Sequence, residues 1–199
     1  MGLEVEVKFA VQDMESVRNS LEDCGASWAD RFFERNAVFD TPDRSLLHQG
    51  VLLRLRRAGG RSTLCLKRPP ASTGNRDVKT FDELQTGVEE PEQLESLLLA
   101  LGFVEAFRYE KLREKWLLGD CLVCLDQLPF GRYVELEGSR AAIFECAEQL
   151  KLPAEGYTTK TYHQLNREKR AEHGLSPEES FVFSEADREA LIERNDFFC

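Results

Sequence analysis

The first residues of the chain alternate strictly between apolar and charged side chains. Leu3, Val5, Val7 and Phe9 are apolar, and Glu4, Glu6 and Lys8 stand between them. A period of two places successive side chains on opposite faces of a β-strand. Residues 3–10 therefore predict a strand with one apolar face and one charged face. The rest of the fold must bury the apolar face and must either expose the charged face to water or neutralise its charges.

Charges two residues apart recur in later strand-like segments, and each segment tends to carry one sign. The residues are Arg54 and Arg56, then Lys111, Arg113 and Lys115, and then Glu135 and Glu137, while Lys67 and Asp126 end apolar runs. One interpretation is a sheet whose charged face meets water. The single sign within each strand, and the helices available to cover the apolar faces, favour charged faces that point inward.

Turn signals divide the chain into about eight strands. The strands are expected at 3–10, 28–40, 50–58, 61–68, 77–86, 103–118, 120–128 and 132–138, with a loop at 69–76. Gly59-Gly60, Gly119-Asp120 and Pro129-Phe130-Gly131 separate neighbouring strands, which is typical of hairpins in an antiparallel sheet. Because eight strands can close, the predicted fold is α+β, an eight-stranded antiparallel β-barrel with helices packed outside.

Helical signals lie between these strands. Helices are expected at 13–24, 91–101, 139–151 and 158–172, with another at 184–194. Asp13 is the expected N-cap of the first helix and Gly25 its end. The helices near 90–101 and 139–151 are either an outer cover or an oligomer contact. The barrel domain is placed at 1–172, followed by an acidic tail at 173–199 whose Phe181, Phe183, Phe197 and Phe198 could dock on the barrel.

Charges inside a barrel are costly unless they are paired or hold ions and ligand. Glu4, Glu6, Glu135 and Glu137 would form an acidic group, and hard oxygen ligands suit Mg²⁺ or Mn²⁺. A basic group would suit phosphate oxygens, and it comprises Arg54, Arg56, Lys67, Lys111, Arg113 and Lys160. Because no P-loop and no G-x-G-x-x-G is present, the sequence predicts a metal–polyphosphate site of another kind.

The overall charge limits the partners. The formal net charge is −10, from 36 acidic and 26 basic residues, which makes a nucleic-acid partner a poor candidate. No stretch approaches the roughly 20 apolar residues that span a bilayer, and no targeting segment is evident, so a cytoplasmic protein without a membrane partner is expected. Cys121 and Cys124 lie in an apolar run, where strand packing is favoured over redox or metal chemistry.

The opening motif Glu4-Val5-Glu6-Val7-Lys8 resembles the E-x-E-x-K signature of the CYTH family, the triphosphate tunnel metalloenzymes. Further pieces follow in the family's order as far as about residue 170. They are Val38-Phe39-Asp40-Thr41, Leu53-Arg54-Leu55-Arg56, Leu66-Lys67, Lys111-Leu112-Arg113, Asp126, Val134-Glu135-Leu136-Glu137 and Thr159-Lys160-Thr161-Tyr162.

This resemblance implies a role for each matched residue. Metal binding falls to Glu4, Glu6, Glu135 and Glu137 with Asp126, and to Glu83, for which Asp82 could compete. Triphosphate binding falls to Lys8, Arg54, Arg56, Lys67, Lys111, Arg113 and Lys160, and catalysis to Lys8, Glu6 and Asp126. The resemblance also allows a homodimer.

Two reactions are known for such a tunnel: metal-dependent hydrolysis of a triphosphate, and cyclisation of ATP to cyclic AMP and pyrophosphate. Hydrolysis of tripolyphosphate or a nucleoside triphosphate is preferred, although residues 106–113 resemble a stretch of class IV adenylyl cyclases. A dedicated thiamine triphosphatase is disfavoured, because Leu52 stands where the vertebrate enzyme has a Trp and no nearby aromatic residue replaces it, although Trp28 or Phe39 could do so from another strand. A non-catalytic polyphosphate binder is a further alternative. For His163, a surface or packing role is favoured over proton transfer.

Overall fold

The computed structural model describes residues 2–70 and 78–196, so most of the predicted loop at 69–76, and Phe197 and Phe198, lie outside the described residues. In chain order the elements are β1 (Gly2–Val11), α1 (Met14–Asp23), β2 (Ser27–Asp40), α2 (Ser45–His48), β3 (Leu52–Ala58), β4 (Arg61–Arg68), β5 (Lys79–Gly87), α3 (Pro91–Ala100), β6 (Val104–Leu118), β7 (Cys121–Leu128), β8 (Gly131–Glu137), α4 (Arg140–Gln149), β9 (Tyr157–Thr158), α5 (Tyr162–Glu172) and α6 (Glu185–Asp196).

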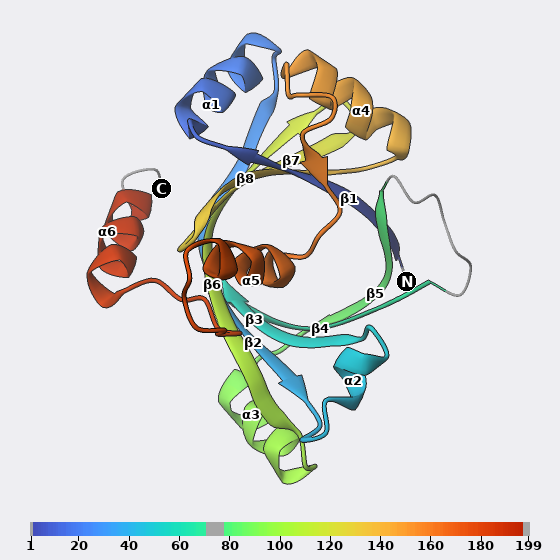
Figure 1. Cartoon of the computed structure of the whole chain (residues 1–199), viewed down its shortest axis with the longest axis vertical. Helices are drawn as coiled ribbons and strands as arrows, with labels where there is room; N and C mark the ends of the chain where they lie inside the picture. The colour runs from blue at the N-terminus through green and yellow to red at the C-terminus, as the bar shows by residue number, and fades with distance from the viewer. Residues whose placement is uncertain (1, 71–77, 197–199) are drawn as a thin grey trace.

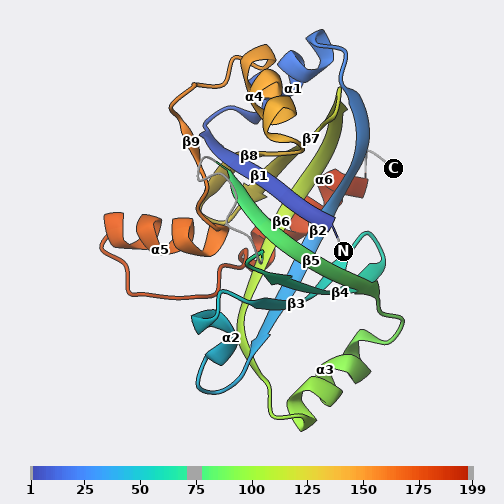
Figure 2. The same cartoon turned by 90° about the vertical axis from the view of Figure 1, so that its right-hand side faces the viewer.

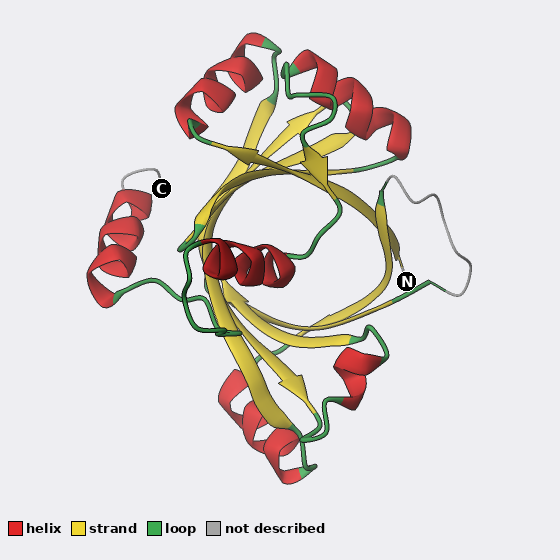
Figure 3. Ribbon diagram, viewed as in Figure 1, coloured by secondary structure: helices red, strands yellow, loops and turns green. Residues whose placement is uncertain are grey.

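Eight strands close into an antiparallel barrel, as the sequence predicts. Their order is β5-β4-β3-β2-β6-β7-β8-β1, and β1 also pairs with β5 (Figures 1 and 3). The first half of β1 pairs with β5 and the second half with β8, with Glu6 in register with both Lys79 and Glu137. The short β9 pairs with β1 beside this ring. The opening strand β1 therefore closes the barrel by joining β8 to β5.

Helices cover the outer, apolar face of the strands (Figure 1). Val7 and Phe9 of β1 belong to one core with Leu21 of α1 and Ile143 of α4. On the opposite side, Leu98 of α3 packs in a second core with the strand residues Ala37, Phe39, Leu53 and Leu55. The helices predicted near 90–101 and 139–151 are thus outer cover, and an oligomer contact through them stays a prediction.

Local capping sets where several helices begin. The Asp13 carboxylate accepts hydrogen bonds from the backbone of Glu15 at 2.9 Å and Ser16 at 3.3 Å, as expected of an N-cap. Helix α5 begins later than predicted because Tyr157–Thr158 pairs with β1 and Thr161 forms a capping box with Gln164. Figure 2 shows that α5 lies at one end of the barrel, and Figure 1 that it crosses in front of that end.

The tail folds back onto the barrel. Phe181 and Phe183 are buried, and Phe183 packs with Leu112 of β6 and Leu191 of α6. Docking is therefore confirmed for these two of the four predicted phenylalanines. Throughout residues 2–70 and 78–196, no helix is both long and apolar enough to span a bilayer.

Candidate active site

The charged strand faces point into the barrel and line a cavity of about 640 Å³. Among the described residues, ten basic side chains line it against five acidic ones, although the whole chain carries a net charge of −10. The basic residues are Lys8, Arg44, Arg54, Arg56, Lys67, Lys79, Lys111, Arg113, Lys115 and Arg167, and the acidic ones are Glu6, Asp40, Glu83, Glu135 and Glu137. Inward-facing charge is confirmed, and the lumen favours an anionic ligand.

Lys8 lies between two carboxylates at the centre of the acidic wall. Its Nζ is 2.6 Å from Glu6 Oε1 on the same strand and 2.9 Å from Glu135 Oε2 on β8. Burial alone would raise the pKa of Glu6, but the adjacent Lys8 ammonium overcomes it and lowers that pKa to about 2. Burial lowers the pKa of Lys8, but Glu135 and Glu6 outweigh it and raise that pKa. Both groups are therefore charged near neutral pH.

Asp126 lies behind the lining, fully buried, and gathers three donors. Arg113 donates to it from Nε at 2.7 Å and from Nη2 at 2.6 Å, and Lys111 Nζ donates at 3.1 Å. The hydroxyl of Tyr162, in the first turn of α5, donates at 2.7 Å. This arrangement fixes two cations of the lumen, while the predicted roles of Asp126 in metal binding and catalysis stay predictions.

Glu34 is a second buried acid, and it was not among the predicted site residues. Its Oε2 is 3.4 Å from Arg56 Nε and 3.7 Å from Lys111 Nζ, and the residue is 0% exposed. Burial alone raises the pKa of Glu34, but these cations hold it well below its usual value. The spacing of two between Glu34 and Asn36 in the predicted strand 28–40 is the signal that would have found it.

Strand β5 contributes an acid and a base. Glu83 lines the cavity 3.5 Å from Lys67 Nζ, whereas Asp82 is outside the lining, so Glu83 is the better placed of the two and its metal-binding role stays a prediction. Lys79 was missed, although it shares the face of Glu83 by the period of two. Its Nζ is 3.1 Å from Glu6 Oε1, and burial lowers its pKa.

Arg54 is held by an aromatic partner. Its Nη1 donates to the hydroxyl of Tyr109 at 2.8 Å, and both residues line the cavity. Its Nε is buried and has no hydrogen-bond partner among the described residues. Because a buried donor without a partner costs free energy, this N–H favours a ligand oxygen.

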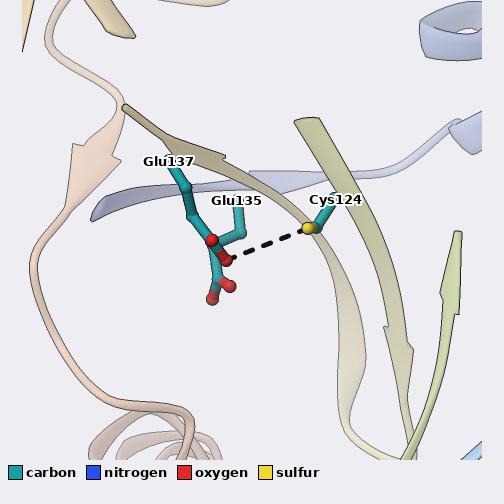
Figure 4. Close-up of side chains that lie close together, drawn as sticks. All are labelled: Cys124, Glu135 and Glu137. Carbon is teal, nitrogen blue, oxygen red and sulfur yellow. Dashed lines mark hydrogen bonds between the residues drawn. The ribbon is translucent and has the colours of Figure 1, made fainter. Parts of the chain in front are cut away.

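The acidic donors fit a hard divalent cation. Donor atoms of Glu135, Glu137 and Cys124 lie within 4.8 Å of one another (Figure 4). Burial raises the pKa of the Cys124 thiol well above its usual value, so the carboxylates are the suitable ligands. Cys121 and Cys124 are both buried and unbridged, in agreement with strand packing. Glu6, Glu135 and Glu137, with Glu83 nearby in the lining, are the carboxylates that could hold a divalent cation, and metal binding by each of them stays a prediction.

The sequence profile of the CYTH domain matches residues 2–162, most of the chain. This chain is a member of the CYTH family. A candidate adenylate cyclase of Methanocaldococcus jannaschii is 27% identical over 144 residues, which cover 72% of this chain and 81% of that protein.

Solved structures share the CYTH fold. A candidate adenylate cyclase from Vibrio parahaemolyticus aligns with a TM-score of 0.70 and 22% identity, covering 82% of this chain and 97% of that one. A candidate adenylyl cyclase from Hippeastrum, described as having a dominant triphosphatase activity, aligns with a TM-score of 0.61 and 15% identity, covering 89% and 98%.

Lys160 and Trp28 do not line this CYTH lumen in the part of the chain that the structure describes. Lys160 is outside the lining, with its Nζ 2.8 Å from Glu168 at the surface, so phosphate binding by Lys160 stays a prediction. The backbone of Glu4 pairs with Phe81, but its side chain lies outside the described residues. Trp28 is 49% exposed and does not line the cavity, and Phe39 borders the cavity but packs its side chain in the outer core with Leu53 and Leu98.

Aromatic residues near α5 complete the lining. The His163 ring stacks on Phe107 at 4.6 Å between centroids and is largely buried, as the favoured packing role requires. Phe107 and Phe181 both line the cavity near Leu52, so rings reach this part of the lumen from β6 and the tail. Phe181 was predicted to dock on the barrel, but that it and Phe107 reach the lumen depends on which strands become neighbours, and no local pattern encodes this.

Proposed function

We propose that this CYTH protein hydrolyses a triphosphate, either inorganic tripolyphosphate or a nucleoside triphosphate, with the aid of a divalent cation. The carrying observation is that one lumen holds both an acidic wall, at Glu6 and Glu135, and an excess of basic side chains. Carboxylates suit the metal, and guanidinium and ammonium groups suit phosphate oxygens. Cations inside a barrel must be desolvated, and an excess of them over the lining carboxylates is costly unless an anionic ligand compensates their charge.

The chain's own residues bind and orient the triphosphate. Arg54 has an unpaired Nε directed to no protein group, and Arg56 and Lys111 share the buried counter-ion Glu34. Arg113 is held by Asp126, so its orientation is fixed before a ligand arrives. Such fixed donors stabilise charge that develops on phosphate oxygens during reaction.

The proposed reaction adds water across one phosphoanhydride bond, so tripolyphosphate gives pyrophosphate and phosphate. A bound divalent cation supplies Lewis-acid polarisation of the phosphate oxygens and lowers the pKa of a bound water. Lys8 stays protonated between Glu6 and Glu135, so it would act as a fixed positive charge rather than as a base.

Cyclisation of ATP is the second candidate. The apolar and aromatic part of the lining, at Leu52, Phe107 and Phe181, could accept a nucleobase next to the cations. Relatives named as candidate adenylate cyclases agree with this alternative. The same aromatic lining leaves thiamine triphosphate as a further substrate to include. A cytoplasmic location and a homodimer remain predictions.

Product analysis tests the proposal. The purified chain is incubated with tripolyphosphate, ATP or thiamine triphosphate, each with Mg²⁺ or Mn²⁺, and phosphate, pyrophosphate and cyclic AMP are separated. Phosphate with pyrophosphate from tripolyphosphate, or phosphate release from ATP, is expected, and excess chelator should abolish it. Cyclic AMP with pyrophosphate would instead establish the cyclase. Tight binding without any product would identify a polyphosphate binder.

A further inference from the structure

Residues 178–188, here called the C-terminal strap, lie beyond the region that matches the CYTH domain and yet reach the lumen. The first residue of the strap is bound to α5: Asn166 Nδ2 of that helix donates to the backbone oxygen of Glu178 at 3.0 Å. The next residue, Glu179, forms an ion pair with Arg44, which lines the cavity. The strap is thus attached to two elements at the mouth of the site.

The strap then pairs with β6. The Phe181 N–H donates to the Arg108 carbonyl at 3.0 Å, and the Glu110 N–H donates to the Phe181 carbonyl at 3.1 Å. Glu110 lies on the outer face of β6, because its neighbours Tyr109 and Lys111 are the ones that line the cavity. The chain is therefore held in register along β6.

A buried carboxylate fastens the outer part of the strap. Glu110 is 6% exposed and accepts hydrogen bonds from the Phe183 N–H at 3.1 Å and from Arg188 Nε at 3.0 and 3.1 Å. Arg188 does not line the cavity. A change at Arg188 can therefore reach the lumen only indirectly, through the strap or through Glu110 and its neighbours on β6.

The ring of Phe181 ends in the lumen against Tyr109. The two rings stack with centroids 5.1 Å apart and an interplanar angle of 28°. The hydroxyl of Tyr109 accepts the 2.8 Å hydrogen bond from Arg54 Nη1. A continuous chain of contacts therefore runs from the hydrogen bonds at Glu110, through Phe181 and Tyr109, to Arg54. The Nε of Arg54 is a buried donor without a partner among the described residues.

We propose that the C-terminal strap is a positioning element of the site, which fixes the Tyr109 ring and thereby directs Arg54 toward a bound polyphosphate. Arg is rich in rotamers, and ordering it on binding is unfavourable, so holding it beforehand strengthens binding. Phe181 and Arg188 are positioning residues in this sense. The inference rests on the proposed function only for the nature of the anion.

Binding measurements on the full chain test the strap. Calorimetric titration with tripolyphosphate and Mg²⁺ compares wild type with Phe181→Ala, Tyr109→Phe and Arg188→Gln. We expect Kd to rise about tenfold for Phe181→Ala and Tyr109→Phe, the size of one hydrogen bond to a charged group, and less for Arg188→Gln. Val182→Ala is the matched control, since Val182 is 43% exposed between two buried phenylalanines, and its Kd should match wild type.

A double-mutant cycle separates positioning from general loosening. If Phe181 acts through Tyr109, then Phe181→Ala should weaken binding no further in a Tyr109→Phe background. Additive losses, or a Phe181→Ala Kd within twofold of wild type, would overturn the inference. Should Phe181→Ala fail to fold, an unchanged Kd for both Tyr109→Phe and Arg188→Gln would overturn it instead.

The outcomes for the strap and for the proposed function are distinct. Wild type that binds tripolyphosphate but hydrolyses neither tripolyphosphate nor ATP refutes hydrolysis, and the strap is then judged by the double-mutant cycle alone. Wild type that binds neither tripolyphosphate nor ATP overturns both.

Discussion

Arg113 and Asp126 face each other across β6 and β7, and the guanidinium donates to both carboxylate oxygens, at 2.7 and 2.6 Å. Lys111 and Tyr162 donate to Oδ2 of the same carboxylate, so most of its acceptor capacity is taken up by the protein. Asp126 therefore acts in this structure as a buried anion that orients the cations of the lumen. These contacts support a structural role for Asp126 in holding the phosphate-binding cations. A direct role in metal binding or catalysis stays a prediction.

Replacing Asp126 by Asn should both destabilise the protein and slow turnover. The buried Arg113 and Lys111 would lose their common counter-ion, which costs about 3 kcal/mol in the free energy of unfolding. Misplaced cations should lower kcat by about tenfold or more. Urea denaturation and tripolyphosphate turnover measure the two effects. Asp120→Asn, in the exposed turn before β7, is the control and should change neither. Wild-type turnover in Asp126→Asn would contradict this reading of the site.

Replacing Glu6 by Gln should abolish metal-dependent turnover while the chain stays folded. Glu6 is 6% exposed and forms ion pairs with Lys8 and Lys79 inside the lumen. Removing its charge should therefore alter the acidic wall and leave the outer apolar core in place. A loss of about 100-fold or more in kcat is expected for a charged group at the reacting phosphates. Glu22→Gln on the exposed side of α1 is the control. Full activity of Glu6→Gln would refute the assignment of the lumen as the active site.

Glu34 predicts a pH dependence of stability. Its pKa is lowered in the folded protein by Lys111 and Arg56, against an unfolded value of about 4.3. The stabilisation is thus complete above about pH 4.3 and is lost as the pH falls toward the folded value. Glu34→Gln should be about 3 kcal/mol less stable than wild type at pH 7, and the gap should shrink by pH 3.5. Urea unfolding at both pH values measures it, and an equal gap at both would contradict the prediction.

Lys79 and Lys160 give a paired test of which lysine binds the triphosphate. Lys79 lines the lumen beside Glu6, whereas Lys160 is held by Glu168 at the surface. Lys79→Met should raise KM for tripolyphosphate about tenfold, and Lys160→Met should raise it less. An increase for Lys160→Met as large as that for Lys79→Met would show that Lys160 moves to the substrate, as the family resemblance implies.

The strands and their two faces could be predicted from the sequence because a period of two is a local property. The alternation of Val5 and Val7 with Glu6 and Lys8 is enforced by backbone geometry in any strand. The turns were equally local, since Gly59 and Gly60 both adopt positive φ, as the hairpin at that point requires. The same spacing identified most of the charged lumen residues, and applied to every predicted strand it would also have included Glu34 and Lys79.

Only the tertiary structure decided which charged groups meet. The pairing of β1 with β5 joins Glu6 to Lys79, residues far apart in the chain, and no local preference encodes that closure. Tyr162 reaches Asp126, whereas Lys160, two residues earlier, remains at the surface, because the capping box at Thr161 sets where α5 begins and so where each side chain points. The sequence by itself determined the chemistry of each strand face, and barrel closure turned those faces into one site.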